Sequence, residues 1–324
     1  MEAFKRLKNA ILSFGRYVPV PVVKQLMADK SEATVKVSRR MISIFFSDIA
    51  GFTTICEPLE PSQILELLTE YFDAMEVEVR ATRGTILEYV GDAILAIWNA
   101  PLKWEEHAAS CIDCALRMHI RLDELRPQWT ARGFPEVRVR VGIHTAEVFH
   151  GNIGSHKRLK YGVLGDGVNL ASRLEELNKR YGTEVLVTAD TQSYPLVQKQ
   201  FLARPVDIVV VKGKAVPTTI FEIVCREEKA DELAREIIEL QCQALKPFLA
   251  QDFDACCDLW AKALKLEKQH EAKYKKEKNT AAGTLLTRMM YNTTKIMYER
   301  AERMKSQPKS DEWDGAEVLK EKHF

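Results

Sequence analysis

The sequence predicts an α+β fold: a ferredoxin-like βαββαβ core with extra strands, a short helical linker before it and a helical extension after it. Three observations predict this fold. Residues 36–226 alternate between short apolar strands and amphipathic helices. Residues 1–35 are short helical stretches interrupted by proline, and residues 227–324 are helical and charged, with an end that reads as disordered. These three zones are the predicted domains.

The bulk composition limits the classes of protein. The chain has 324 residues, of which 46% are hydrophobic, and this is enough for one sizeable core and a smaller second unit. Its net charge of +1 argues against a nucleic-acid partner. Seven cysteines, an odd number, fit a reducing cytoplasm. No apolar run reaches the ~18 residues of a membrane span. We therefore expect a cytoplasmic protein, or the cytosolic part of a membrane receptor whose sensor domain precedes Met1.

The first zone contains two short helical patterns. Pro21 stands where the first turn of the second helix is expected. In the first helix, apolar residues recur in steps of three and four at Phe4, Leu7, Ile11, Phe14 and Val18. Two roles stay open for this zone: a helix that docks on the core, and a signalling helix that pairs two subunits.

The middle zone supplies the core elements. Strands are expected at residues 41–46, 85–90, 93–98, 137–141 and 184–187, with a hairpin over 206–223. One amphipathic helix begins at Pro61 and ends at Gly84, and another spans 105–125. The order strand, helix, strand, strand, helix, strand predicts an antiparallel sheet with helices on one face.

The last zone predicts two antiparallel helices that are separated at Gln251-Asp252, followed by a third helix over 280–304. The pair faintly resembles a single tetratricopeptide-type hairpin. One such repeat cannot bury its own apolar face, so we expect it to dock on the core or on a partner. The motifs described below all end before Val224, so we expect the extension to be dispensable for chemistry but to alter regulation or dimer stability.

Two aspartates stand at the ends of neighbouring strands. Asp48 ends the first strand, and Asp92 lies at the tip of the strand-turn-strand unit. In a ferredoxin-like sheet these positions adjoin, so the two carboxylates are placed to share a pair of divalent cations that activate a hydroxyl group and neutralise a triphosphate. Each aspartate taken alone is better explained as an ordinary turn residue.

Small residues follow the first aspartate. Ala50 and Gly51 precede a helix that starts near Phe52 and Thr53. Backbone N–H groups at such a helix start can face phosphate oxygens, so these four residues form a candidate phosphate-binding segment.

Five motifs decide between these interpretations. They are FSDIAGFT at residues 46–53, GDA at 91–93, RVGIHT at 140–145, GDGVNLASRL at 165–174 and KGK at 212–214. Together, and in this order, they closely resemble the motifs of class III adenylate and guanylate cyclases. The resemblance covers residues 36–226 and does not extend to the last zone with comparable specificity.

The resemblance implies a role for each motif residue. Asp48 and Asp92 would bind two divalent cations, Mg²⁺ or Mn²⁺, with the carbonyl group of Ile49 as an extra ligand. Asn169 would orient the ribose, and Arg173 would hold the α-phosphate in the transition state. Asn169 and Arg173 are four residues apart, so they share one helix face.

Two positively charged side chains, those of Arg140 and Lys212, would hold the terminal phosphates by the same resemblance. Without it, both would be taken for exposed strand charges and Arg173 for a helix-surface residue. The implied reaction is in-line attack of the 3′-hydroxyl on the α-phosphorus with loss of pyrophosphate. In the family, each site takes metal ligands from one subunit and the Asn169- and Arg173-type groups from the other, so a homodimer is implied.

The base is selected, by the same resemblance, at Glu88 and Gly162. Adenylate cyclases usually carry Lys at the first position and Asp or Thr at the second. A carboxylate accepts from guanine N1–H and the 2-amino group, so Glu88 favours GTP, while Gly162 offers no side chain to read the base. We therefore expect a guanylate cyclase, with an adenylate cyclase that uses ATP as the alternative.

Two other classes of protein stay as alternatives. A catalytically silent, cyclase-like regulatory domain would be expected to lack a metal-binding Asp, Asn169 or Arg173, and all of these are present. Another two-metal palm enzyme, such as a diguanylate cyclase, would carry a Gly-Gly-Asp/Glu-Glu-Phe string, which this sequence lacks.

Overall fold

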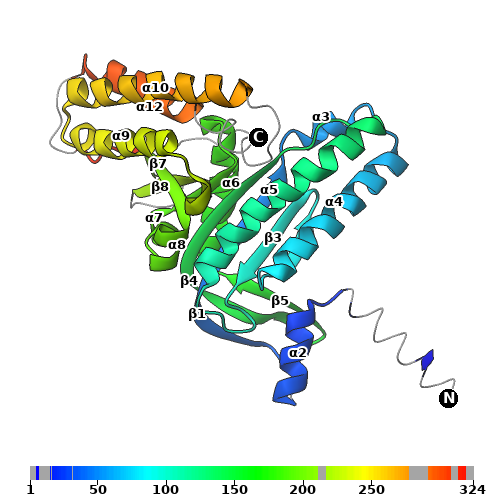
Figure 1. Ribbon diagram of the computed structural model, residues 1–324. Helices are drawn as coiled ribbons and strands as arrows, with labels where there is room; N and C mark the ends of the chain where they lie inside the picture. The colour runs from blue at the N-terminus through cyan, green and yellow to red at the C-terminus, as the bar shows by residue number, and fades with distance from the viewer. Residues whose placement is uncertain are drawn as a thin grey trace.

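The structure is a computed structural model that describes residues 5–6, 15, 17–30, 32–210, 217–276, 291–307 and 313–318. In this described part a nine-stranded sheet runs in the order β2-β3-β1-β4-β6-β8-β7-β9, and β5 pairs with β4 (Figure 1). The strands are β1 (Lys36–Ile49), β2 (Thr85–Val90), β3 (Ala93–Trp98), β4 (Val139–Ser155), β5 (Arg158–Leu164), β6 (Val185–Thr188), β7 (Phe201–Val210), β8 (Thr218–Arg226) and β9 (Glu317–Val318). The helices are α2 (Val20–Asp29), α3 (Phe52–Cys56), α4 (Pro61–Ala81), α5 (His107–Ala131), α6 (Asp166–Tyr181), α7 (Ala189–Gln192), α8 (Pro195–Gln200), α9 (Glu232–Leu249), α10 (Phe253–Lys276) and α12 (Tyr291–Met304), with a 3₁₀ turn η1 (Glu227–Lys229).

The predicted α+β class and the order β1-α4-β2-β3-α5-β4 are confirmed. Strand β1 lies in the middle of this unit and pairs antiparallel with both β3 and β4. Its carboxyl end therefore reaches the turn between β2 and β3 on one side and the start of β4 on the other. Asp48 pairs in register with Arg140.

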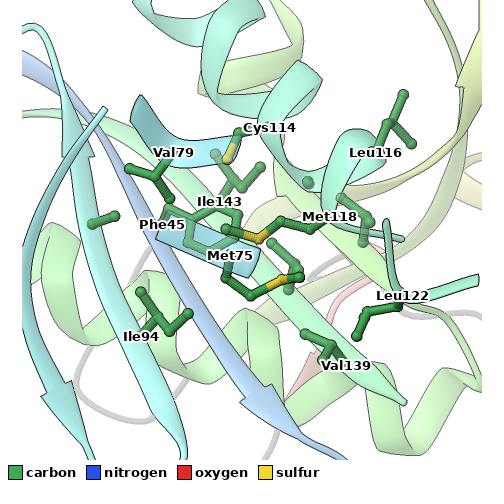
Figure 2. Packing of buried hydrophobic residues seen from close by; sticks show 14 of the residues in the cluster. Phe45, Met75, Val79, Ile94, Cys114, Leu116, Met118, Leu122, Val139 and Ile143 are labelled. Atoms are coloured by element: carbon green, nitrogen blue, oxygen red, sulfur yellow. The ribbon is translucent and has the colours of Figure 1, made fainter. Parts of the chain in front are cut away.

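The two helices of this unit, α4 and α5, lie on one face of the sheet as expected, and α6, which follows the unit, covers the other face. Alternate residues of a strand point to opposite faces. Phe45 and Ile143 pack with helices α4 and α5, as Figure 2 shows around Met75 and Met118. Ile42 and Ile44 of the same strand pack with Ala171 of α6 on the other face. The apolar runs fit this arrangement, because a strand covered on both faces needs apolar residues at every position.

The hairpin of β4 and β5 was not predicted from the sequence. Strand β4 continues to Ser155 rather than ending at residue 141, and β5 pairs with its second half. Polar residues and glycines interrupt the alternating pattern there, and two of them, Gly151 and Gly154, have positive φ values of 146° and 137°. The backbone pairing continues through them because glycine adopts these angles without a Cβ clash.

The first zone is only partly described. Helix α2 carries a proline in its first turn as predicted, and Val22 is buried. Of the apolar residues that predicted an earlier helix, Phe4, Leu7, Ile11 and Phe14 lie outside the described residues. No helix in the described part of the chain is long and apolar enough to span a membrane.

The C-terminal extension packs against β7 and β8. Helices α9 and α10 form the predicted antiparallel pair, separated at Gln251-Asp252, and α12 lies against α10 (Figure 1). Apolar residues of α9 and α10 share a buried cluster with Val224 and Cys225 of β8. The expected third helix is described from Tyr291, and the earlier part of its predicted span, 280–290, lies outside the described residues.

Residues 313–318 differ from the expected disordered end. Trp313 packs edge-on against Phe248 with ring centroids 5.4 Å apart, and its Nε1 donates a hydrogen bond to the Phe248 carbonyl at 3.2 Å. Glu317–Val318 then forms β9, which pairs in parallel with β7. The large aromatic side chain of Trp313 accounts for this order. It buries apolar area, which the average composition of the segment does not indicate.

One buried arginine joins the extension to the sheet. Arg204 of β7 is 0% exposed. Its Nε donates to Glu222 Oε2 of β8 at 2.6 Å, and its Nη1 donates to Glu267 Oε1 of α10 at 3.3 Å. Its Nη2 donates to Thr293 Oγ1 of α12 at 3.2 Å. One guanidinium thus connects four elements.

Arg204→Met is expected to lower the free energy of unfolding by about 3–5 kcal/mol, because it leaves two carboxyl groups without their buried counter-charge. Burial raises the pKa of Glu222 and of Glu267 to about 7. The loss should therefore be larger at pH 8, where the folded protein must hold both groups ionised, than at pH 6, where they accept protons. Denaturant titration at the two pH values measures it.

Arg158→Met, at an exposed position of β5, is the matched control, and we expect a change within about 0.5 kcal/mol. Equal losses for the two variants, or no pH dependence for Arg204→Met, would contradict the assignment.

Candidate active site

The two predicted metal ligands lie next to each other. Asp48 is the penultimate residue of β1, and Asp92 occupies the turn between β2 and β3. The backbone N–H of Ile49 donates to Asp92 Oδ2 at 3.2 Å. The tight turn requires Gly91, whose φ of 65° lies in the left-handed region. The backbone of β1 therefore fixes where the second carboxylate sits.

The two carboxyl groups repel each other when both are charged. Burial, together with the adjacent Asp92, raises the pKa of Asp48 to about 7. The groups lie within hydrogen-bond reach of each other, and Arg140 only partly offsets the repulsion. A cation between them would remove the repulsion and hold both groups ionised.

This donor set fits hard divalent cations. Two adjacent carboxylates, with backbone carbonyl groups such as that of Ile49 nearby, are oxygen ligands of the kind that Mg²⁺ and Mn²⁺ prefer. The raised pKa of Asp48 gives the same indication, because a proton and a metal ion compete for the same oxygens.

Arg140 lies beside this pair. Its Nη2 is 3.5 Å from Asp48 Oδ2, and its Nε is 2.9 Å from Glu175 Oε1 of α6. Burial raises the pKa of Glu175 to about 8 against the opposing effect of Arg140. The arginine predicted to hold terminal phosphates is thus held between two acidic groups, next to the carboxylate pair.

The predicted phosphate-binding segment begins a short helix. Gly51 has a φ of 70° and precedes α3, which starts at Phe52. The first N–H groups of a helix have no acceptor within the helix, so those of Phe52 and Thr53 are free for an outside oxygen as far as the helix itself is concerned. Ala50 differs, because its N–H already donates to the Arg138 carbonyl at 2.8 Å. Lys212 lies outside the described residues.

Asn169 and Arg173 both lie on α6, as their spacing predicts. Asn169 is exposed, Arg173 is half-buried, and the neighbouring residues Leu170, Ala171 and Leu174 face the sheet. In the described part of the chain, neither residue forms a hydrogen bond or ion pair with Asp48 or Asp92. The structure therefore brings the two carboxylates together but not these two groups with them.

An unpredicted residue lies near the two positions that were predicted to select the base. Lys160 of β5 forms an ion pair with Glu88 of β2. Gly162 lies two residues further along β5, on the same face as Lys160. A Cβ at Gly162 would meet only Ile153 Cδ1, at 3.5 Å, so a side chain fits there. Glu88 and Gly162 therefore border one region.

Sequence reasoning missed Glu175 and Lys160. The resemblance could have pointed to Glu175, which stands one residue beyond the GDGVNLASRL motif, but no rule of spacing connects it with Arg140 35 residues earlier. Lys160 is 72 residues from Glu88. Lys160 could have been found if strand β5 had been recognised, because a hairpin after β4 places residues 158–164 beside the core.

The family model described as "Adenylate and Guanylate cyclase catalytic domain" matches residues 35–223. The chain belongs to this family. Its cyclase domain is 37% identical over 222 residues to Adenylate cyclase 1 of Rhizobium meliloti, which covers 68% of this chain and 33% of that protein. It is 33% identical over 233 residues to the adenylate cyclase of Anabaena cylindrica, covering 68% of this chain and 44% of that protein. The chain thus spans less than half of these relatives.

Two solved cyclase structures are similar in fold and sequence. The adenylyl cyclase CyaB from P. aeruginosa is 31% identical with a TM-score of 0.54, over 59% of this chain and 96% of that one. The guanylyl cyclase Cya2 is 34% identical with a TM-score of 0.53, over 59% and 95%. The predicted family and its fold are confirmed, and class III cyclase domains act on nucleotides with divalent metal ions. Both curated relatives are named adenylate cyclases, and of the two solved structures one is named an adenylyl and the other a guanylyl cyclase.

Proposed function

We propose that this chain is a nucleotide cyclase that converts GTP to 3′,5′-cyclic GMP and pyrophosphate, at a site shared by the two subunits of a homodimer. The observation that carries the proposal is the adjacent pair Asp48 and Asp92, in a domain of the cyclase family. In this proposal residues 36–226 are the catalytic domain, 1–35 are a linker and 227–324 are an extension. All seven cysteines are free, which supports a cytoplasmic location.

Asp48 and Asp92, with the carbonyl group of Ile49, would hold two divalent cations, Mg²⁺ or Mn²⁺. When bound, such cations lower the pKa of the attacking hydroxyl and neutralise charge on the triphosphate. Arg140, which lies 3.5 Å from Asp48, is placed to bind the terminal phosphates once the cations satisfy that carboxylate. Lys212 would assist it.

The remaining groups orient the nucleotide. Asn169 holds the ribose so that the 3′-oxygen faces the α-phosphorus. Arg173 binds the α-phosphate oxygens, where a fixed guanidinium stabilises the charge that shifts as the new O–P bond forms and the bond to pyrophosphate breaks. No covalent intermediate with the protein is required.

A shared site is supported by the position of α6. Glu175 is the residue of α6 that meets Arg140 beside Asp48, and at about 100° per residue Arg173 lies about 200° from it around the helix. Asn169 lies on the exposed side of α6, and Arg173 is half-buried. A second copy, related by two-fold symmetry, would supply these two groups to the metal site and receive the same from the first copy.

Glu88 supports GTP, because its carboxylate can accept from guanine N1–H and the 2-amino group. The guanylyl cyclase Cya2 gives a solved precedent at 34% identity. ATP is the second candidate. The curated relatives described above are adenylate cyclases, and the Lys160 ammonium beside Glu88 can donate to adenine N1.

Product analysis of the purified protein with GTP or ATP, and Mn²⁺ or Mg²⁺, tests the function. We expect cyclic GMP as the main product. Glu88→Lys should then lower the ratio of kcat/KM for GTP over ATP by about tenfold or more, since an ammonium leaves two guanine donors unpaired. Adding Gly162→Asp should lower the ratio again, because the new carboxylate accepts from the adenine 6-amino group.

Glu124→Lys, on the exposed side of α5, repeats the charge change away from the site. Its ratio should equal that of the wild type. An unchanged ratio in active Glu88 variants would mean that Glu88 does not read the base, and the preference for GTP would lose its physical support.

A further inference from the structure

The C-terminal end of α6 is held by the extension. Tyr181 Oη, in the last turn of α6, donates to Asp207 Oδ2 at 2.6 Å, and Arg300 Nη1 of α12 donates to Asp207 Oδ1 at 2.5 Å. Arg300 Nη2 also donates to the Gly315 carbonyl at 2.9 Å. Beside this chain of contacts, Arg180 of α6 forms an ion pair with Glu317 of β9. Both α12 and β9 belong to the extension.

The ion pair between Asp207 and Arg300 is strengthened by its burial. The Asp207 side chain is 0% exposed and that of Arg300 is 8% exposed, so water competes little for either charge. Burial raises the pKa of Asp207, and Arg300 acts in the opposite direction and favours its ionised form. The extension therefore supplies the counter-charge for a buried carboxylate that also binds α6.

The middle of α6 is fixed by the core itself. A Cβ at Gly142 of β4 would lie 2.2 Å from the Ala171 carbonyl oxygen, so helix and strand approach as closely as glycine allows. Asn178 Nδ2 donates to the Val141 carbonyl at 2.9 Å. Helix α6 is thus held on the sheet from Ala171 to Asn178, and its last two residues also contact the extension, directly or through Asp207.

We propose that the C-terminal extension positions Asn169 and Arg173 for catalysis by holding the end of α6 through Arg300 and Glu317. The inference rests on the proposed function of these two residues. Arg173 stands eight residues before Tyr181, or about 12 Å along the helix. A helix is stiff over that length, so a change at its end tilts α6 about the close contact at Gly142 and alters how both groups meet the nucleotide. Arg300 and Glu317 are positioning residues, because they act through α6.

Two variants test this, and each is compared with the wild type as a full-length chain. Arg300→Met removes the contact with Asp207, and Glu317→Gln removes the charge opposite Arg180 with little change in volume. We expect kcat to fall about 2- to 30-fold in Arg300→Met, and less in Glu317→Gln, with KM and the half-saturating metal concentration nearly unchanged. Asp48 and Asp92 lie on other elements, so loss of general structure alone would not give this pattern. Arg300→Lys should recover part of kcat.

Amide hydrogen exchange gives a readout that does not depend on activity. In Arg300→Met, exchange should speed up across residues 166–181 and stay unchanged in α4, which belongs to the same core. Arg303→Met, one turn further along α12 at an exposed position, is the matched control and should alter neither kcat nor exchange.

Unchanged kcat in folded Arg300→Met and Glu317→Gln, with an active wild type, overturns this inference and leaves the proposed function standing. Faster exchange in α6 with an unchanged kcat overturns the inference as well, because the contacts of Arg300 and Glu317 would then stabilise the helix without affecting catalysis. A wild type that makes no cyclic nucleotide from either substrate means that the proposed function has failed, and the catalytic role of the extension fails with it.

Discussion

Asp48→Ala and Asp92→Ala should each lower kcat by about a thousandfold or more without unfolding the protein. Two cations cannot be held by one carboxylate, so the 3′-hydroxyl would not be activated and the charge on the triphosphate would not be neutralised. Activity with Mn²⁺ and with Mg²⁺ measures the loss.

Unlike kcat, the free energy of unfolding should not fall in Asp48→Ala. Burial and the neighbouring Asp92 raise the pKa of Asp48 to about 7, so at pH 8 the metal-free protein holds this group ionised at a cost. Removing it should leave the metal-free protein equally stable or more stable, and any gain should be larger at pH 8 than at pH 6. Arg140 retains Glu175 as a partner.

Asp258→Ala, at an exposed position of α10, serves as the control for both measurements. Near-full activity in Asp48→Ala or Asp92→Ala, with an unchanged metal requirement, would refute the two-metal site. A variant that is inactive because it is unfolded would show in the same denaturation curves.

Mixing Asp48→Ala chains with Arg173→Ala chains should restore activity that neither has alone. In a heterodimer, the Arg173→Ala chain supplies an intact carboxylate pair and the Asp48→Ala chain supplies an intact Asn169 and Arg173. Random pairing at equal concentrations makes half of the dimers mixed, each with one working site of two, so about 25% of wild-type activity is the upper expectation.

The chains should carry two different affinity tags, so that mixed dimers can be isolated and counted. Mixing Asp48→Ala with Asp92→Ala chains is the control, because each site then takes its carboxylate pair from one damaged chain or the other and no intact pair is present. Mixed dimers that form but stay inactive would exclude a site shared between subunits.

Local sequence patterns predicted those helices and strands whose ends are marked by residues within or next to the element. The strands at 85–90 and 93–98 and the helix start at Pro61 agree with the structure, because turn residues and a helix-starting proline mark them. The second half of β4 and all of β5 were missed. Their stability comes from pairing with each other and with β1, and such pairing leaves little trace in a pattern broken by glycine and polar residues.

The candidate site divides in the same way. The carboxylate pair was predicted because both aspartates lie in short motifs at strand ends. The contacts of Arg140 with Glu175 and of Glu88 with Lys160 were not, since each joins elements that only the folded sheet brings together. Helix α6 was placed by resemblance alone, and its position over the second face of the sheet depends on Gly142, whose missing side chain no periodicity reveals.

The buried guanidinium of Arg204 has a practical consequence for any attempt to isolate the catalytic region. A fragment cut at residue 223, where the family model ends, would stop inside β8 and would discard Glu267 and Thr293. Arg204 and Glu222 would then face solvent, and the fragment would also lose Val224 and Cys225, which pack with α9 and α10 in the intact chain. Such a fragment should aggregate when expressed alone, and limited proteolysis of the full chain should not release it. We therefore expect the cooperative folding unit of this protein to extend beyond the residues that the family model matches, and expression of its active form should include residues up to at least Val318.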